Sequence, residues 1–308
     1  MVTTITLNPM LDKSVTINRL ERGAIHRATK MEMVAGGKGI NVSRQLRHLG
    51  IDTVATGFLG GEVGSIMTRL LTAEAINHDF VLTAAMTREG VTYHEPSGVW
   101  TALFEPPLRI DIEAVHKLSK KIEFLASKSS WLVCGGSSPG NEADDVFYEA
   151  ILSAHRHGIT SVLDSYGYAL ELGLKAQPTM VKPNKREFEL TFGQSLKTDH
   201  EYVEAINVLL KGGARYCIIS DGSNPLYAGI QGHYWKVIPP AVPAVNPTGS
   251  GDAMVGGILY GFHQGWKFER SLAFGAAAGA ANARKWEVAN SSLAEIATLE
   301  PDVKLQRL

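Results

Sequence analysis

A carboxylate that follows a run of small residues is the most distinctive chemical feature of the sequence. Residues 246–252 read Asn-Pro-Thr-Gly-Ser-Gly-Asp, and an Ala- and Gly-rich stretch typical of a closely packed helix follows. Gly249 and Gly251 lack a Cβ, so the backbone around Ser250 can approach a ligand closely. A helix that begins at Asp252 would present free N–H groups and partial positive charge to an anion. Asp252 is therefore a candidate catalytic base for an attacking hydroxyl, and the alternative is a simple helix cap.

A second glycine loop occupies residues 35–42, which read Ala-Gly-Gly-Lys-Gly-Ile-Asn-Val. It is not a Walker A loop, because Gly39 follows Lys38 directly. It is not the G-x-G-x-x-G fingerprint of dinucleotide-binding proteins either, and it does not follow the first strand directly. The backbone N–H groups at Gly37, with the side chains of Lys38 and Asn41, could bind sugar hydroxyls or a phosphate. The alternative is a tight turn that carries a surface lysine.

A third candidate lies at residues 181–187, Val-Lys-Pro-Asn-Lys-Arg-Glu. A strand ends at Lys182, and a helix follows Pro183. Asn184 and Glu187 are three residues apart, so they share one face of the first helical turn. Together they could hold water and Mg²⁺ near nucleotide phosphates, because Mg²⁺ prefers oxygen ligands and keeps several of its waters. The same spacing is that of a capping box, which is the alternative interpretation.

The elements that position these motifs alternate between strand and helix. The predicted strands are residues 3–7, 52–58, 131–134, 159–163, 179–182 and 216–220, and the predicted helices are residues 40–49, 63–71, 144–157, 200–210, 252–264 and 269–285. This order predicts an α/β fold with a doubly wound, mostly parallel sheet that carries helices on both faces. In such folds, ligands bind in a crevice at the carboxyl ends of the strands.

Two stretches break the alternation, approximately residues 13–34 and 90–104. Each is poor in helix formers, alternates apolar and polar residues, and suggests a strand, a turn and a second strand. Together they predict a small β lid over the crevice; the alternative is a pair of surface hairpins with no role. We see no linker or repeat, so we expect residues 1–308 to form one domain with this lid.

Composition excludes several classes of function. The chain has 308 residues with a formal net charge of −1, and this lack of a basic field argues against nucleic acid as a general partner. No apolar stretch has the length of a membrane span, and no signal peptide is visible. The two cysteines, Cys134 and Cys217, lie in apolar runs typical of buried thiols. We therefore expect a cytoplasmic protein with no membrane partner.

In this order and spacing, the three motifs resemble those of the PfkB, or ribokinase-like, family of sugar kinases. The resemblance covers essentially the whole chain and includes three further segments, residues 6–12 (Thr-Leu-Asn-Pro-Met-Leu-Asp), 57–61 and 87–88. It is strongest to the branch that acts on phosphorylated ketohexoses, which comprises tagatose-6-phosphate kinase, 1-phosphofructokinase and the minor 6-phosphofructokinase. The resemblance implies a ribokinase-like fold, ATP and Mg²⁺ as cofactors, and a lid that often pairs with that of a second subunit, giving a homodimer.

The resemblance also implies an activity and a role for each matching residue. The activity is ATP-dependent transfer to a hydroxyl of tagatose 6-phosphate or fructose 6-phosphate, giving the 1,6-bisphosphate; the alternative is 1-phosphofructokinase activity. The resemblance implies that Asp252 is the catalytic base and that an anion hole beside it is formed by Gly249, Ser250 and Gly251. The implied sugar-phosphate ligands are Asp12, Gly37, Lys38, Asn41 and Arg88. The implied ATP site consists of Lys182, Asn184, Ser220, Gly222 and Asn282, and the implied Mg²⁺ ligands, acting through water, are Asn184 and Glu187.

The sequence departs from the family pattern at three places. Residues 220–225, Ser-Asp-Gly-Ser-Asn-Pro, replace a glycine-rich turn, and Asp221 adds an anion where phosphates are expected. Gly136 stands where a substrate-contacting serine is usual, with Ser137 next to it. Glu89 and Gly90 follow Arg88 where the branch often has an apolar or polar residue and then Asn. The altered turn leaves open a weakly active sugar-phosphate-binding regulator. The missing fingerprint after the first strand argues against a nicotinamide enzyme.

Overall fold

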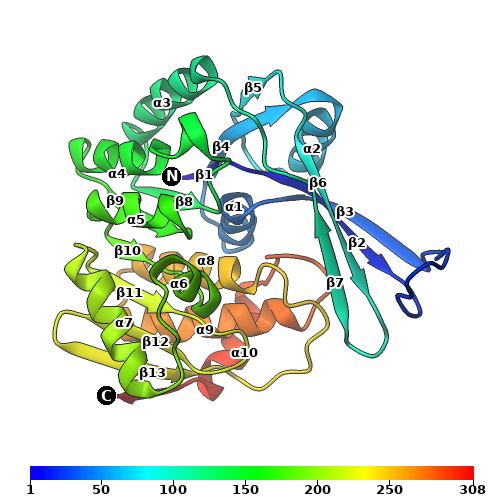
Figure 1. Cartoon of the computed structure of the whole chain (residues 1–308). Coiled ribbons are helices and arrows are strands. Elements are labelled where there is room, and N and C mark those ends of the chain that lie inside the picture. The colour runs from blue at the N-terminus through cyan, green and yellow to red at the C-terminus, as the bar shows by residue number, and fades with distance from the viewer.

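The computed structural model describes the backbone of residues 1–308 and every side chain except that of Asn141. The described residues form a ten-stranded sheet with the order β14-β13-β12-β11-β10-β9-β8-β1-β4-β5 (Figure 1). Its strands are β1 (Val2–Thr6), β4 (Thr53–Gly60), β5 (Val81–Thr83), β8 (Trp131–Gly135), β9 (Thr160–Asp164), β10 (Met180–Val181), β11 (Tyr216–Ile219), β12 (Leu226–Ile230), β13 (His233–Ile238) and β14 (Lys304–Arg307). The run from β5 to β11 is parallel, and β12, β13 and β14 extend it with antiparallel pairs.

Helices cover both faces of this sheet. They are α1 (Lys38–His48), α2 (Gly61–Ala73), α3 (Ile112–Ala126), α4 (Val146–Arg156), α5 (Tyr168–Lys175), α6 (Lys185–Phe192), α7 (Asp199–Lys211), α8 (Ser250–His263), α9 (Phe268–Ala283) and α10 (Leu293–Leu299). One core cluster joins the sheet to α3, α4, α5 and α7, and a second joins it to α1, α8 and α9. The prediction of a mostly parallel sheet with helices on both faces is therefore confirmed.

The small residues of α8 and α9 allow these two helices to pack unusually closely. A Cβ on Gly257 would lie 2.9 Å from the Cα of Gly275, and a Cβ on Gly261 would lie 2.8 Å from the Cβ of Ser271. Larger side chains at these positions would push the helices apart. Close packing fixes the position of α8, and with it the position of the helix start that the sequence singles out.

A separate four-stranded sheet, here called the small sheet, projects from the α/β body (Figure 1). It has the order β3-β2-β6-β7 and consists of β2 (Met10–Thr16), β3 (Lys30–Gly36), β6 (Arg88–His94) and β7 (Trp100–Phe104). β2 with β3 and β6 with β7 form antiparallel pairs, and β2 runs parallel to β6 between them. Both stretches expected to be strand, turn and strand have that form, with β2 starting three residues earlier than expected.

The observed elements differ from the predicted ones in two ways. Helix α8 begins at Ser250 with Gly249 as its N-cap, so Asp252 lies inside the first turn rather than at the start of the helix. Helices α3, α5 and α10, the short strand β5 and the antiparallel strands β12, β13 and β14 have no counterpart in the prediction. Among the described residues, no helix combines the length and the apolar character needed to cross a bilayer.

Candidate active site

Five charged side chains meet where the strands at the centre of the main sheet end, and we call them the charged cluster: Lys38, Asp164, Lys182, Glu187 and Asp252. Asp164 ends β9, and Lys182 follows the neighbouring strand β10. The Asp164 carboxylate lies 2.6 Å from Lys38 Nζ and 2.9 Å from Lys182 Nζ. Lys38 Nζ also pairs with a Glu187 carboxylate oxygen. The carboxyl ends of the strands therefore carry a compact set of cations and carboxylates, as expected in an open α/β sheet.

The two buried carboxylates of this cluster, Asp164 and Asp252, have pKa values shifted in opposite directions. Burial raises the pKa of Asp164, but Lys182 and Lys38 outweigh it, and the net pKa lies below the ordinary value. Burial also raises the pKa of Asp252, the charge of Asp164 raises it further, and the value reaches about 7 in spite of Lys38 and the hydrogen bond from Asn41. One carboxylate is thus held ionised while the other titrates near neutrality. Such a separation is typical of acid–base sites.

Asp252 is oriented by a contact between two helices. Asn41 Nδ2 of α1 donates a 2.7 Å hydrogen bond to Asp252 Oδ2 of α8. The amide of Asn41 is itself oriented by Arg44, whose Nη1 donates to Asn41 Oδ1 over 2.7 Å. Because Asn41 Oδ1 is occupied by a cation, its Nδ2 group faces the carboxylate. Asn41 and Asp252 were predicted in separate motifs, and the fold brings them into direct contact.

The glycine loop before α8 approaches this cluster closely. Gly249 has φ 77°, a left-handed conformation that favours glycine, and a Cβ there would collide with Val288. A Cβ on Gly251 would lie 3.4 Å from Lys182 Nζ, so the loop and the lysine share one small space. The first turn of a helix leaves N–H groups without intrahelical partners, and Ser250 begins that turn here. The arrangement suits an anion bound between these N–H groups and the lysines.

Asn282, which we expected at the nucleotide site, lies beneath this loop. Its side chain is fully buried. Its Nδ2 donates to Thr248 O over 2.8 Å and to Ser250 Oγ over 3.0 Å, and its Oδ1 accepts from Ala289 N. Both polar groups of its side chain thus have partners inside the protein. These bonds hold the loop before α8 in shape.

The pair Asn184 and Glu187 forms the capping box that we gave as the alternative interpretation. Asn184 Oδ1 accepts from Glu187 N, and Asn184 N donates to Glu187 Oε2, each over 2.9 Å. Glu187 Oε1 remains directed at the cluster, where it meets Lys38. Among the described side chains, no three His, Cys, Asp or Glu residues come together as a protein metal cage would require. Glu187 and Asp164 nevertheless fit Mg²⁺ that is held mainly by phosphates and water, since one or two carboxylates suffice there.

The altered turn at residues 220–225 lies next to α6. Lys185 N donates to Ser220 O over 2.7 Å, and Gly222 has φ 59° with open space on its Cβ side. The carboxylate of Asp221 accepts from Tyr202 Oη and from Asn224 Nδ2, each over 3.2 Å, and lies 3.9 Å from Lys185 Nζ. The added anion is therefore partly neutralised by its own neighbours.

Asp12 and Arg88 lie at diagonal positions on one face of the small sheet. His94, on the same face, contacts Trp286 of the α/β body, with ring centroids 4.8 Å apart, so this face turns toward the body. Asp12 pairs with Gly90 across β2 and β6, and Met10 pairs with Arg88. Burial raises the pKa of Asp12. Within the described part of the chain, Asp12 Oδ1 and Arg88 Nε are buried without a hydrogen-bond partner. Buried polar atoms of this kind require a polar partner, and a sugar phosphate offers both hydroxyls and an anion.

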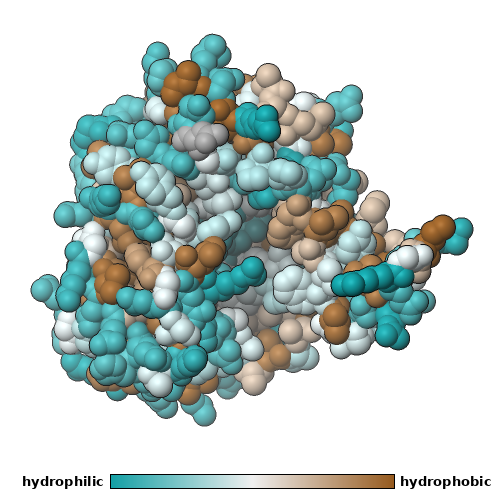
Figure 2. Space-filling view, in the orientation of Figure 1, coloured by the Kyte–Doolittle hydropathy of each residue, from teal (hydrophilic) through white to brown (hydrophobic). Residues whose placement is uncertain are grey.

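A neighbouring asparagine joins the small sheet to the loop after β8. Asn8 O accepts from Arg88 Nη2 over 3.2 Å, and Asn8 Nδ2 donates to Ser137 Oγ over 3.1 Å. Ser137 is the serine adjacent to the unusual Gly136. The surface is hollowed between the small sheet and the α/β body (Figure 2).

Gly37, the remaining predicted residue, connects the small sheet to α1. It has φ 130°, and a Cβ there would lie 2.6 Å from Thr6 Cγ2. Glycine is therefore required at the point where the chain leaves β3 and enters the helix that carries Lys38 and Asn41.

Sequence reasoning missed Asp164, which lies at the centre of the charged cluster. No glycine loop or recurring spacing surrounds it, and it is simply the residue that ends a short buried strand. An acidic residue at the carboxyl end of a buried parallel strand was the available signal. The ion pair with Lys182 then depends on strand order, because β9 and β10 are neighbours in the sheet.

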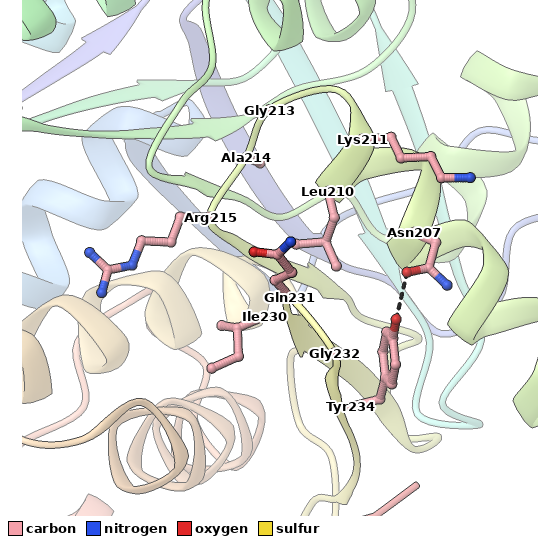
Figure 3. A pocket seen from close by; sticks show the side chains of 10 residues that line it. All are labelled: Asn207, Leu210, Lys211, Gly213, Ala214, Arg215, Ile230, Gln231, Gly232 and Tyr234. Carbon is pink, nitrogen blue, oxygen red and sulfur yellow. Dashed lines mark hydrogen bonds between the residues drawn. The ribbon is translucent and has the colours of Figure 1, made fainter.

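A separate pocket of about 670 Å³ lies far along the sheet, between α7 and the β12–β13 hairpin (Figure 3). Leu210 and Ile230 line its interior, and Tyr234 Oη donates to Asn207 Oδ1 over 2.6 Å at its edge. The charged ends of Lys211 and Arg215 point away from each other (Figure 3). None of the predicted site residues lines this pocket, and it lacks the converging polar groups of the charged cluster.

Comparisons with known proteins show the family to which the chain belongs. The family model described as pfkB family carbohydrate kinase matches residues 4–295, so the chain belongs to that family. A 1-phosphofructokinase of Borreliella burgdorferi is 31% identical over 92% of this chain and 92% of the relative. A tagatose-6-phosphate kinase of Staphylococcus epidermidis is 31% identical over 86% of each chain. The solved structure of the tetrameric inhibited form of phosphofructokinase-2 from Escherichia coli is 26% identical, with a TM-score of 0.88 over 98% of each chain.

Proposed function

We propose that this chain transfers the γ-phosphoryl group of ATP to a hydroxyl of a phosphorylated ketohexose. The observation that carries the proposal is Asp252, a buried carboxylate with a pKa of about 7 in the first turn of a glycine-preceded helix. A general base works best when its pKa lies near the operating pH. Perturbed pKa values of this kind cluster at functional sites.

In the proposed reaction, Asp252 accepts the proton of the attacking hydroxyl, and Asn41 keeps its carboxylate in the orientation that receives it. The N–H groups of the loop at Gly249–Gly251 stabilise charge on the transferring phosphoryl group, and Lys182, 2.9 Å from Asp164, adds a fixed cation there. Phosphoryl transfer needs mainly such positioning and charge stabilisation. Mg²⁺, when bound with the nucleotide, would neutralise phosphate charge beside Glu187 and Asp164.

The acceptor that we propose already carries a phosphate. Arg88 is half-buried with Nε unpaired among the described residues, and a guanidinium group suits a phosphate because its N–H groups form a fork. Asp12 lies two residues along β2 from Met10, and its carboxylate would accept hydrogen bonds from sugar hydroxyls. A cleft with a cation at one end and a carboxylate at the other fits a phosphorylated sugar better than a free one.

Tagatose 6-phosphate and fructose 6-phosphate are the acceptors that we place first, with the 1,6-bisphosphate as product. Fructose 1-phosphate is the second candidate, and the relative from Borreliella burgdorferi, named 1-phosphofructokinase, favours it. A weakly active binding protein is less well supported, because Asp221 has hydrogen-bond partners of its own and lies near Lys185. These substrates also fit an enzyme of the cytoplasm.

A coupled ADP-release assay with ATP and Mg²⁺ tests the proposal directly. The acceptors are tagatose 6-phosphate, fructose 6-phosphate, fructose 1-phosphate, and unphosphorylated fructose and ribose. Turnover limited to phosphorylated ketoses would support the proposal and identify the acceptor. Turnover with the free sugars alone would contradict the role of Arg88. ADP release with none of them, together with thermal stabilisation by one sugar phosphate, would favour the binding protein.

The small sheet offers a surface for a second copy of the chain. Its outer face exposes Leu103 (68%), Met31 (58%) and Met33 (43%), an apolar set on strands that already form a sheet. Exposed apolar patches of this kind often mark protein–protein contacts. We include in the proposal a homodimer in which two small sheets pack together, with each sheet covering its own active site.

A further inference from the structure

We infer that Met10 and Phe104 form an apolar wall over Gly90 that makes the enzyme sensitive to the configuration of one sugar hydroxyl. This inference rests on the proposed function, because it concerns which phosphorylated ketose the same cleft accepts. It starts from a two-by-two arrangement of residues on the inner face of the small sheet. Met10 is opposite Arg88, and Asp12 is opposite Gly90.

Strand geometry places all four residues on the same side of the sheet. Residues two apart on a strand share a face, as do residues directly opposite each other on paired strands. Asp12 and Arg88 are both substrate ligands in the proposed function, and they occupy diagonal corners of the arrangement. The other two corners, Met10 and Gly90, therefore lie between the group that grips hydroxyls and the group that grips the phosphate.

Neighbouring side chains fill the space beside Gly90 that a Cβ would otherwise occupy. A Cβ on Gly90 would collide with Met10 Sδ and would lie 2.8 Å from Phe104 Cδ1 and 2.9 Å from Met10 Cε. Phe104 reaches this point because it pairs with Gly90 from the other side, across β6 and β7. A thioether and an aromatic ring thus cover the backbone at the position where a side chain of residue 90 would otherwise project.

This wall differs chemically from everything around it. Asp12, Arg88 and Asn8 offer hydrogen bonds, whereas Met10 and Phe104 present only carbon, sulfur and ring atoms. A sugar hydroxyl pressed against such atoms loses its hydrogen bonds to water and gains none in return, which costs binding free energy. A sugar carbon that turns its C–H bond toward the wall has no hydrogen bond to lose. The wall should therefore favour one of two epimers that differ at the carbon facing it.

Tagatose 6-phosphate and fructose 6-phosphate are epimers at C4, and psicose 6-phosphate and fructose 6-phosphate are epimers at C3. We expect wild-type protein to discriminate within one of these pairs by roughly 10- to 100-fold in kcat/KM, the size typical of such apolar selection. Met10→Gln keeps the length of the side chain and adds a polar end. It should reduce that ratio by about tenfold, mainly through KM for the disfavoured epimer. Met10→Leu, which stays apolar, should preserve the ratio.

The matched control is Met33→Gln, the same substitution on the outer face of the small sheet, where the side chain is 43% exposed. It should leave the epimer ratio unchanged. Phe104→Asn supplies a second test that does not depend on the folding of Met10→Gln, because Phe104 is 53% exposed. It should shift the ratio in the same direction as Met10→Gln. Thermal unfolding of each variant verifies that the proteins compared are folded.

The outcomes separate this inference from the function on which it rests. A wild-type protein that phosphorylates ketose phosphates but whose epimer ratios do not change in Met10→Gln or Phe104→Asn would overturn the wall as a selectivity element. Equal losses for both epimers would do the same, since they would indicate general damage to the cleft. A wild-type protein that neither turns over nor binds any ketose phosphate would overturn the proposed function, and the inference with it.

Discussion

Asn41 Nδ2 lies 2.7 Å from Asp252 Oδ2. Helix α1, which follows the glycine loop at residues 35–39, therefore orients the carboxylate that follows the glycine loop at residues 249–251. Asn41 and Asp252 are separated by 211 positions in the sequence. Their contact joins the part of the chain next to the small sheet to the loop that we propose for phosphoryl transfer. The hydrogen bond also stabilises the ionised form of Asp252 and so opposes the effect of burial on its pKa.

Replacing Asp252 by Asn should remove the base while preserving the shape of the site. We expect kcat to fall roughly 10²- to 10⁴-fold, the usual contribution of general base catalysis, with little change in the KM for the sugar phosphate. The control is Asp145→Asn, because Asp145 precedes α4, is exposed, and makes no side-chain capping bond. Steady-state ADP release measures both variants. An Asp252→Asn enzyme with wild-type kcat would exclude Asp252 as the base.

The pH dependence of the reaction should follow the ionisation of Asp252. A base must be deprotonated, so kcat/KM should rise with pH through about 7, where this carboxylate titrates. In Asn41→Ala the hydrogen bond that favours the charged form is lost, and the rising limb should move to higher pH. Ionisation of the substrate phosphate is the same for both proteins and cannot produce that difference. Superimposable profiles would show that another group controls the limb.

Asp252 should also make the fold less stable as pH rises. Its pKa is about 7 when folded and about 3.9 when unfolded, so folding favours the protonated form. The resulting stabilisation is complete below about pH 3.9 and is lost as pH rises through about 7. Asn at this position cannot ionise. The Tm of Asp252→Asn should therefore exceed that of wild type by more at pH 8 than at pH 5.

Asp164→Asn is the contrasting variant for the same measurement of Tm at pH 5 and pH 8. The pKa of Asp164 is lowered in the folded protein by Lys182 and Lys38, so its charge stabilises the fold above its unfolded pKa. Asp164→Asn should lower the Tm at pH 5 and at pH 8, because two lysines then lack their shared carboxylate. A parallel pH dependence of Tm in the two variants would contradict the different environments described for Asp252 and Asp164.

The glycine loops and their polar residues could be predicted from sequence because each motif is local. Gly37 and Gly249 stand where the chain requires a left-handed or crowded backbone, and their neighbours in sequence carry the chemistry. Asp164 could not be predicted in this way, since its importance comes from the adjacency of β9 and β10. The bracing role of Asn282 likewise depends on the loop folding over α9, which no local pattern indicates.

One element that was not predicted, helix α3, nevertheless has a clear signal in the sequence. Helix α3 has Ala114, Leu118, Ile122 and Leu125 buried on one face, a spacing typical of an amphipathic helix. Asp111 caps it, because its Oδ1 accepts a hydrogen bond from Ala114 N. The two-residue strand β10 is different. Its pairing depends on neighbours on both sides, and its length alone gives too little periodicity to show where it lies in the sheet.

Asn282→Ala should act on the loop rather than on nucleotide contacts. The substitution leaves Thr248 O, Ser250 Oγ and Ala289 N without their partner, at a cost of about 2–3 kcal/mol in the free energy of unfolding. We expect a lower Tm together with a lower kcat. The control is Asn207→Ala, which removes a single bond to Tyr234 far from the site. An unchanged Tm with a raised KM for ATP would instead indicate a direct nucleotide contact.

The outer face of the small sheet should control the oligomeric state. Leu103 is 68% exposed and pairs with Val91 on that face, so Leu103→Glu would place two charges in the proposed interface of the dimer. We expect light scattering to report a dimer for wild type and a monomer for this variant, because an unpaired buried charge is strongly unfavourable. Leu190→Glu on α6, where Leu190 is 67% exposed, is the matched control and should remain dimeric. If both variants keep the wild-type mass, two copies do not meet through this face of the small sheet.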